Sequence, residues 1–170
     1  MANIEMMVDS IRVSMMNYQA MRGGAASGFD DNPRVLVLKE KTGARYLPIW
    51  IGPAEADAIA VKIQGVEPSR PLAPDFTCAV IDAVGANLES AIINALENDT
   101  FYAKVVLRVE GVPLEVDCRP SDALAVAIRV DAPIFADEEV LKKASIVLPE
   151  AESLGQRADD GRLDIFSKDA

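Results

Sequence analysis

Two stretches of equal length align without a gap: residues 47–63 read LPIWIGPAEADAIAVKI, and residues 114–130 read LEVDCRPSDALAVAIRV. In each, an apolar-rich extended run passes through a proline into alanines at helical spacing. Proline is favoured at the first position of a helix because the amide donor that it lacks has no helical partner there. The alignment therefore predicts the same strand-to-helix transition twice, with helices that begin near Pro53 and Pro120.

We expect a β-β-β-α-α unit to occur twice, in residues 6–85 and 86–148. Alternating polar and apolar residues predict three strands before each of the two aligned helices. The fold class is then α+β: a mixed sheet with flanking helices, whose two similar halves share a core. In this prediction residues 1–148 form a single domain, and residues 149–170 form a polar, flexible tail.

Smaller features of the sequence agree with this order. Val8-Asp9-Ser10 in the first predicted strand matches Leu88-Glu89-Ser90 in the fourth. A second helix of the first half is expected over residues 74–85, with a stripe of apolar residues of the kind that packs on a core. The residues of this stripe are Phe76, Ala79, Val80, Ala83 and Val84. A short helix over residues 138–144 is expected to be capped by Asp137.

The chain contains no histidine, which restricts its chemistry more than any other count. Ser-His-Asp and Cys-His sites, an HExxH zinc helix and a zinc deaminase site are all excluded. A general acid or base must be Asp, Glu, Lys, Tyr or Cys, and a metal ion would be held mainly by oxygen atoms. Such ligands favour Mg²⁺ or Mn²⁺ over zinc.

The net charge of −10 argues against a protein that coats nucleic acid or an anionic membrane, because such binding needs clustered cations. A locally basic groove or a bound metal can still override this overall sign. Cys78 and Cys118 lie far apart and are expected to be small core residues of a protein in the reducing cytoplasm. We expect no signal peptide and no membrane span, because no apolar run approaches the length of about 18 residues that a span needs.

Three carboxylates, Glu55, Asp75 and Asp122, lie within the first turns of predicted helices. One interpretation is structural, because a carboxylate there faces the positive end of the helix and accepts backbone amide protons. The functional interpretation is that the fold gathers them into a catalytic cluster. Both interpretations remain open from the sequence.

A candidate metal site combines Glu55, Asp117 and Asp122, whose oxygens suit Mg²⁺ or Mn²⁺. Arg70 and Arg119 each lie beside a proline and are candidates to bind the phosphate of a substrate. They are equally suited to a salt bridge, such as one between Arg119 and Asp122, because arginine binds carboxylates and phosphates with the same geometry.

Several of these motifs together resemble the bifunctional nuclease domain family, over residues 6–148. The motifs are Leu47-Pro-Ile-Trp-Ile-Gly-Pro-Ala-Glu-Ala, Arg70-Pro-Leu-Ala-Pro-Asp-Phe, Asp99-Thr-Phe-Tyr-Ala, Asp117-Cys-Arg-Pro-Ser-Asp-Ala and Ala132-Pro-Ile-Phe. The resemblance implies a duplicated α+β fold with a curved, barrel-like sheet, a homodimer, and nuclease activity on DNA and RNA.

One departure from the family pattern affects the expected activity. The family commonly has Thr-His-Asp after Arg-Pro-Leu, whereas Ala73-Pro74-Asp75 stands here. If that histidine transfers protons in relatives, this protein is weakened or inactive; if it only caps the helix, Pro74 replaces it without loss. We therefore expect a nuclease that hydrolyses phosphodiester bonds with Glu55, Asp75 and Asp122, and the alternative is a non-catalytic homodimeric binding or regulatory module.

Overall fold

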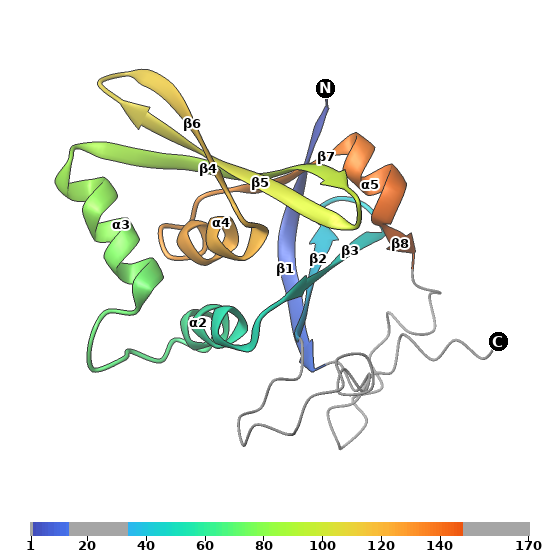
Figure 1. Cartoon of the computed structure of the whole chain (residues 1–170), viewed down its shortest axis with the longest axis horizontal. Coiled ribbons are helices and arrows are strands. Elements are labelled where there is room, and N and C mark those ends of the chain that lie inside the picture. The colour runs from blue at the N-terminus through green and yellow to red at the C-terminus, as the bar shows by residue number, and fades with distance from the viewer. Residues whose placement is uncertain (1, 14–33, 148–170) are drawn as a thin grey trace.

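The computed structural model describes residues 2–13 and 34–147, and this part of the chain forms one mixed sheet of eight strands with four helices (Figure 1). The strands are β1 (Asn3–Val13), β2 (Arg34–Glu40), β3 (Arg45–Ile51), β4 (Ala86–Glu97), β5 (Thr100–Val109), β6 (Val112–Cys118), β7 (Ile134–Asp137) and β8 (Ile146–Val147). The helices are α2 (Pro53–Ile63), α3 (Ala73–Ala83), α4 (Pro120–Ala127) and α5 (Glu138–Ala144). The predicted α+β class is confirmed. Predictions that concern residues 14–33 and the tail at 149–170 lie outside the described residues.

The strand order is β6-β5-β4-β7-β1-β2-β3-β8, so the sheet is open, with β6 and β8 at its two edges. β1–β2–β3 and β4–β5–β6 are both antiparallel meanders. The short strand β7 joins them, antiparallel to β1 and parallel to β4. The curved, barrel-like sheet that the family resemblance implied is therefore not confirmed.

The two halves share a register shift in their first strands but differ in the order of their elements. The ladder of β1 shifts register between Val8 and Ser10, and that of β4 shifts between Leu88 and Ser90, at the positions that match in the sequence. Such bulges increase the local twist of a strand. In the second half, however, β7 lies between α4 and α5, so the predicted β-β-β-α-α order holds only for the first half. An internal duplication remains a prediction.

The core is aliphatic, and α4 is the helix that lies deepest in it. Seven of the eight residues of α4 are buried. The helix packs against β4, β5, α2 and α3, so it lies between the sheet and the other two helices (Figure 1). Its alanines have small side chains, which lets neighbouring backbones come close. Cys78 and Cys118 are free thiols that pack against this core, as expected, and burial raises the pKa of Cys118 to about 11.

Helix α3 departs from the sequence prediction, because its apolar stripe faces outward. Phe76, Val80 and Val84 are 65%, 43% and 69% exposed, and none of the residues of α3 is buried. On β6, Val112, Leu114 and Val116 alternate along the strand and are also exposed. The apolar stripe of α3 therefore lies outside the core of the same chain.

The hairpin of β2 and β3 is tied to α5 by a partly buried ionic cluster. Arg45 pairs with Glu40, which is 7% exposed, and with Glu138 at the start of α5. Its guanidinium lowers the pKa of both carboxyl groups. The cluster fixes the edge of the sheet that carries β8. Within residues 2–13 and 34–147, no helix is long and apolar enough to cross a membrane.

Candidate functional site

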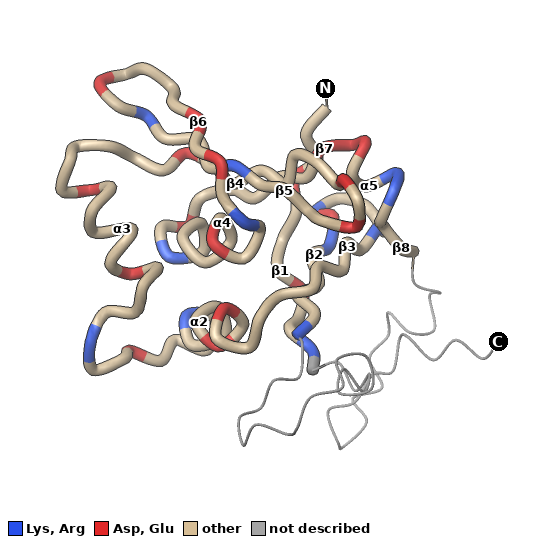
Figure 2. The backbone as a smooth tube through the Cα atoms, viewed as in Figure 1, with Lys and Arg blue, Asp and Glu red and all other residues tan. Residues whose placement is uncertain are grey.

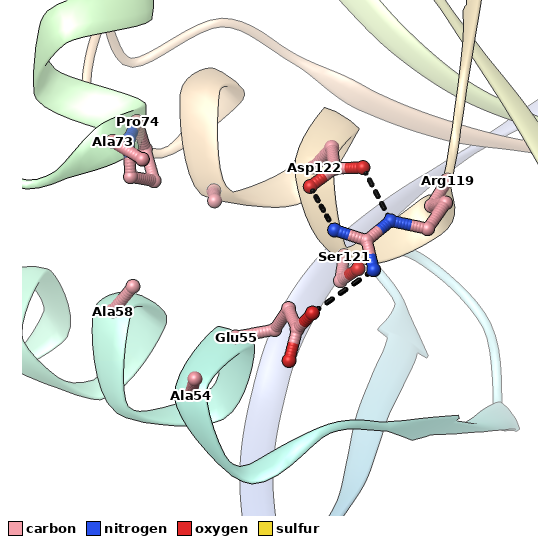
Figure 3. A pocket seen from close by; sticks show the side chains of 9 residues that line it. Ala54, Glu55, Ala58, Ala73, Pro74, Arg119, Ser121 and Asp122 are labelled. Carbon is pink, nitrogen blue, oxygen red and sulfur yellow. Dashed lines mark hydrogen bonds and ion pairs between the residues drawn. The ribbon is translucent and has the colours of Figure 1, made fainter.

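The first turns of α2 and α4 lie on either side of a pocket of about 210 Å³ (Figure 3). The start of α3 closes a third side. The pocket is lined by Ala54, Glu55 and Ala58 of α2, by Ala73 and Pro74 of α3, by Ser121, Asp122 and Ala125 of α4, and by Arg119. Four of the nine lining residues are alanines, and the charged groups are Glu55, Arg119 and Asp122.

Arg119 is the N-cap residue of α4, and its guanidinium joins the two carboxylates of the pocket. Nε and Nη2 donate to the two oxygens of Asp122 at 2.7 and 2.9 Å, and Nη1 donates to Oε1 of Glu55 at 2.9 Å (Figure 3). The two carboxylates raise the pKa of Arg119, Asp122 most strongly, so the guanidinium stays charged. A guanidinium has five N–H groups, of which three are used here. Two N–H donors remain on a side chain that is 65% exposed.

The carboxylate of Glu55 lies over Gly52, the residue before α2. A Cβ atom at Gly52 would lie 2.2 Å from Oε2 of Glu55, which is closer than atoms can approach. The backbone of Gly52 is extended, with φ of −70°, so any residue could adopt its conformation. Glycine is needed here for space, because a side chain would displace the carboxylate of Glu55.

Asp75 does not line the pocket, and both of its carboxylate oxygens accept hydrogen bonds at the start of α3. Its Oδ2 accepts a hydrogen bond from the backbone N–H of Leu72 at 2.8 Å, as a capping carboxylate does. Its Oδ1 accepts from Nε of Arg129 at 2.6 Å, and this bond lowers the pKa of Asp75. The structural interpretation of an acidic helix start therefore fits Asp75, whereas Glu55 and Asp122 pair with Arg119.

Two of the predicted site residues lie apart from the pocket. Asp117 is exposed on β6, where it is paired with Lys104 of β5 in the ladder. Arg70 is exposed in the linker before α3 and forms no hydrogen bond or ion pair with the described part of the chain. The structure thus brings Glu55, Asp122 and Arg119 together.

The arrangement does not fit a divalent cation. Over residues 2–13 and 34–147 there is no group of three or more Asp, Glu, Cys or His side chains that could hold a metal ion. The predicted ligands Glu55 and Asp122 both bind Arg119, whose positive charge lies where a cation would be held. The Mg²⁺ or Mn²⁺ site remains a prediction that the geometry does not support.

The sequence analysis did not single out Ser121 or the alanine wall, although the internal alignment contains a signal for both. Three pairs of pocket residues occupy matching positions of the two aligned stretches: Ala54 and Ser121, Glu55 and Asp122, and Ala58 and Ala125. Gly52 and Arg119 also match. The pocket therefore lies where matching faces of two similar helices meet.

The fold and the pocket define an α+β domain in which one arginine joins two carboxylates at facing helix starts. A family model described as the bifunctional nuclease domain matches residues 36–149, which include every residue of the pocket. The chain belongs to the bifunctional nuclease domain family, as the sequence motifs indicated.

Two relatives come from two strains of Mycobacterium tuberculosis, and each is described as an uncharacterized protein. Each is 45% identical to this chain over 119 residues, which cover 70% of this chain and 71% of the relative. These relatives support the family membership and carry no statement of activity.

Proposed function

We propose that this protein is a nuclease that hydrolyses phosphodiester bonds in DNA and RNA at the pocket between α2 and α4. The observation that supports this proposal most is the placement of Arg119, whose two unused N–H donors lie at the pocket beside the carboxylate of Glu55. Membership of the bifunctional nuclease domain family supports the reaction class.

Arg119 is the proposed phosphate-binding residue. Its two remaining N–H groups can bind the non-bridging oxygens of a phosphodiester, because arginine presents paired donors that match phosphate geometry. Asp122 holds the guanidinium with two bonds and so fixes its direction. A rigidly held donor stabilises charge that develops in the transition state more than a mobile donor does.

Glu55 is the proposed general base. In a chain without histidine, a carboxylate is the natural group to accept a proton from the attacking water. The oxygen of the water forms a bond to phosphorus as Glu55 accepts its proton, and the bond to the leaving oxygen breaks on the opposite side of phosphorus. The leaving oxygen takes a proton from a solvent water, and Glu55 returns its proton to solvent.

A cleavage assay tests the proposal with purified protein and end-labelled single-stranded RNA and DNA, in Mg²⁺, in Mn²⁺ and in EDTA. We expect cleavage by the wild-type protein and loss of cleavage in Glu55→Gln, which keeps the size of the side chain. Glu115→Gln is the matched control. Glu115 lies on β6, outside the pocket, and forms an exposed ion pair with Lys104 of β5. Equal, background cleavage by all three proteins in every buffer would contradict the proposal.

A second candidate is a non-catalytic homodimeric binding or regulatory module in the cytoplasm. It is favoured by the outward apolar stripe of α3 and the exposed apolar residues of β6. Large exposed apolar patches mark interaction sites on soluble proteins. A second copy of a chain with net charge −10 would approach most readily through such an uncharged surface.

Sedimentation velocity tests the homodimer. We expect a dimer for the wild-type protein and a monomer for Val80→Glu, because the new carboxylate would be buried in the interface without a partner. Val147→Glu is the matched control, since Val147 is 66% exposed on β8, at the opposite edge of the sheet from β6. A monomeric wild-type protein would exclude the homodimer.

A further inference from the structure

We propose that Arg129 is a positioning residue for the pocket: its buried guanidinium holds α2, α3 and α4 at the spacing that lets Glu55 reach Arg119. Its relevance to catalysis rests on the proposed nuclease function. The geometric part of the proposal does not rest on that function and is tested separately below.

The contacts of Arg129 connect the three helices whose residues line the pocket. Its Nε donates to Oδ1 of Asp75 at the start of α3 at 2.6 Å. Its Nη1 donates to the carbonyl oxygen of Ala125 in α4 at 2.8 Å, and its Nη2 donates to that of Ala58 in α2 at 3.1 Å. The side chain is only 5% exposed. Each N atom of one guanidinium thus binds a different helix.

These bonds are made one turn beyond the ionic part of the pocket. Ala58 follows Glu55 by three residues, and Ala125 follows Asp122 by three residues, so each alanine lies on the same face of its helix as the acidic residue. Both alanines line the pocket themselves. Arg129 therefore holds the two helical turns that directly follow the facing carboxylates. The Glu55–Arg119 bridge spans the space between the two helices (Figure 3).

The chemistry of the contacts requires arginine. Ala125 lies in the last turn of α4, where carbonyl oxygens have no helical partner, and a cation at this end of a helix is favourable. Three acceptors in different directions match the planar fork of a guanidinium, whereas the ammonium of lysine cannot reach all three at once. Asp75, itself fixed by the N–H of Leu72, neutralises the buried charge.

The first test is a crystal structure of Arg129→Lys. The distance from Oε1 of Glu55 to Nη1 of Arg119 is now 2.9 Å, and we expect it to exceed 4 Å. The reason is that lysine cannot replace the bond from Arg129 to the carbonyl oxygen of Ala58 in α2. An unchanged distance would overturn the proposal whether or not the protein is a nuclease.

The second test compares turnover and melting temperature. Arg45→Lys is the matched control, because Arg45 also joins two elements through two carboxylates but lies on the hairpin that holds α5. We expect Arg129→Lys to lose at least about 10-fold in kcat, since a displacement of about 1 Å can cost far more than this. Arg45→Lys is expected to keep its kcat while it lowers the melting temperature.

The outcomes separate the two proposals. A kcat that falls equally in both lysine variants means that Arg129 acts only through stability, and this overturns the positioning role. A wild-type protein without turnover contradicts the nuclease proposal, and the crystallographic distance then decides the positioning role alone. If Arg129→Lys fails to fold, Asp75→Asn is used in the crystallographic test, because it weakens the hold of Arg129 on α3 and retains a side chain that can accept from Leu72.

Discussion

The starts of α2 and α4 face each other across the pocket and occupy matching positions of the two aligned stretches, yet they differ at the position before the proline. Both helices begin with proline and place an acidic residue two positions later, Glu55 in α2 and Asp122 in α4. Before the proline stands Gly52 in one stretch and Arg119 in the other. Glycine leaves room for the carboxylate of Glu55, and arginine supplies the cation that both carboxylates bind.

This difference shows how two similar helix starts can form one asymmetric site. Two glycines would leave two carboxylates facing each other without a cation. Two arginines would remove the space that Glu55 occupies and add a second positive charge. The tube view shows acidic positions, drawn in red, on both α2 and α4 (Figure 2). With one arginine between two acids, three N–H groups of the guanidinium bind the carboxylates and two N–H groups remain.

The largest effect is expected from Arg119→Met, which removes the cation and keeps an unbranched side chain of similar length. Cleavage should fall by about 100-fold or more, the usual cost of losing one fixed donor to the transition state. The free energy of unfolding should fall by less than about 1 kcal/mol, because the side chain is exposed and ion pairs of this kind contribute little. Cleavage assays and urea denaturation measure the two quantities. A variant that retains full cleavage would show that the phosphate binds elsewhere.

Gly52→Ala is expected to have the next largest effect, and it tests the residue before α2 as Arg119→Met tests the residue before α4. The added methyl group displaces the flexible end of Glu55, so cleavage should fall by about 10-fold while the fold is retained. The double variant Gly52→Ala/Glu55→Gln should cleave no less than Glu55→Gln alone, because both changes act on one carboxylate. Additive losses in the double variant would show that Gly52 acts through the backbone instead.

The sequence predicted the elements of this fold better than their packing. Proline, glycine and alternation placed the starts of α2, α4 and the long strands, because these signals are local. The strand β7 was missed, since a run of four residues that lies between β1 and β4 is defined by its partners and not by its own pattern. The outward stripe of α3 was also missed, because periodicity shows which face is apolar but not what covers it.

The same limit applies to the candidate site. The alignment and the helix starts identified Glu55, Asp122 and Arg119, which the structure brings together. The sequence also suggested Asp117 and Arg70 as site residues. Asp117 lies on a strand and Arg70 on a linker, and the positions of both elements depend on tertiary packing. The partner of Asp75, Arg129, lies 54 positions away in the sequence, so no local pattern could have indicated it.

Pro74→His is expected to have a smaller effect, in the direction of a gain. Pro74 lines the pocket at the start of α3, where the family commonly has histidine, so an imidazole there would lie at the proposed phosphate site. We expect cleavage to rise by about fivefold, less than a fully positioned acid or base provides. The chain has no other histidine, so a new ionisation near pH 6.5 in the pH profile would identify the group. Pro74→Gln is the control, because it is polar but does not titrate in this range; an equal gain in that variant would exclude proton transfer.

The smallest effect is expected from Asp75→Asn and concerns the third acidic helix start, which pairs with a buried arginine instead of the pocket arginine. The bond to Arg129 lowers the pKa of Asp75 below its ordinary value of 3.8. A carboxyl group with a lowered folded pKa contributes stability that is fully present above the unfolded pKa and is lost as the pH falls through the folded pKa. The difference in the free energy of unfolding between wild type and Asp75→Asn should therefore be constant from pH 7 to about 5, and should shrink as the pH falls below 3.8.

Urea denaturation of both proteins at each pH measures this difference. The subtraction removes the contributions of Glu40 and Glu138, which both proteins share. A difference that stays constant down to pH 3 would mean that the ionised form of Asp75 is not the form that holds Arg129.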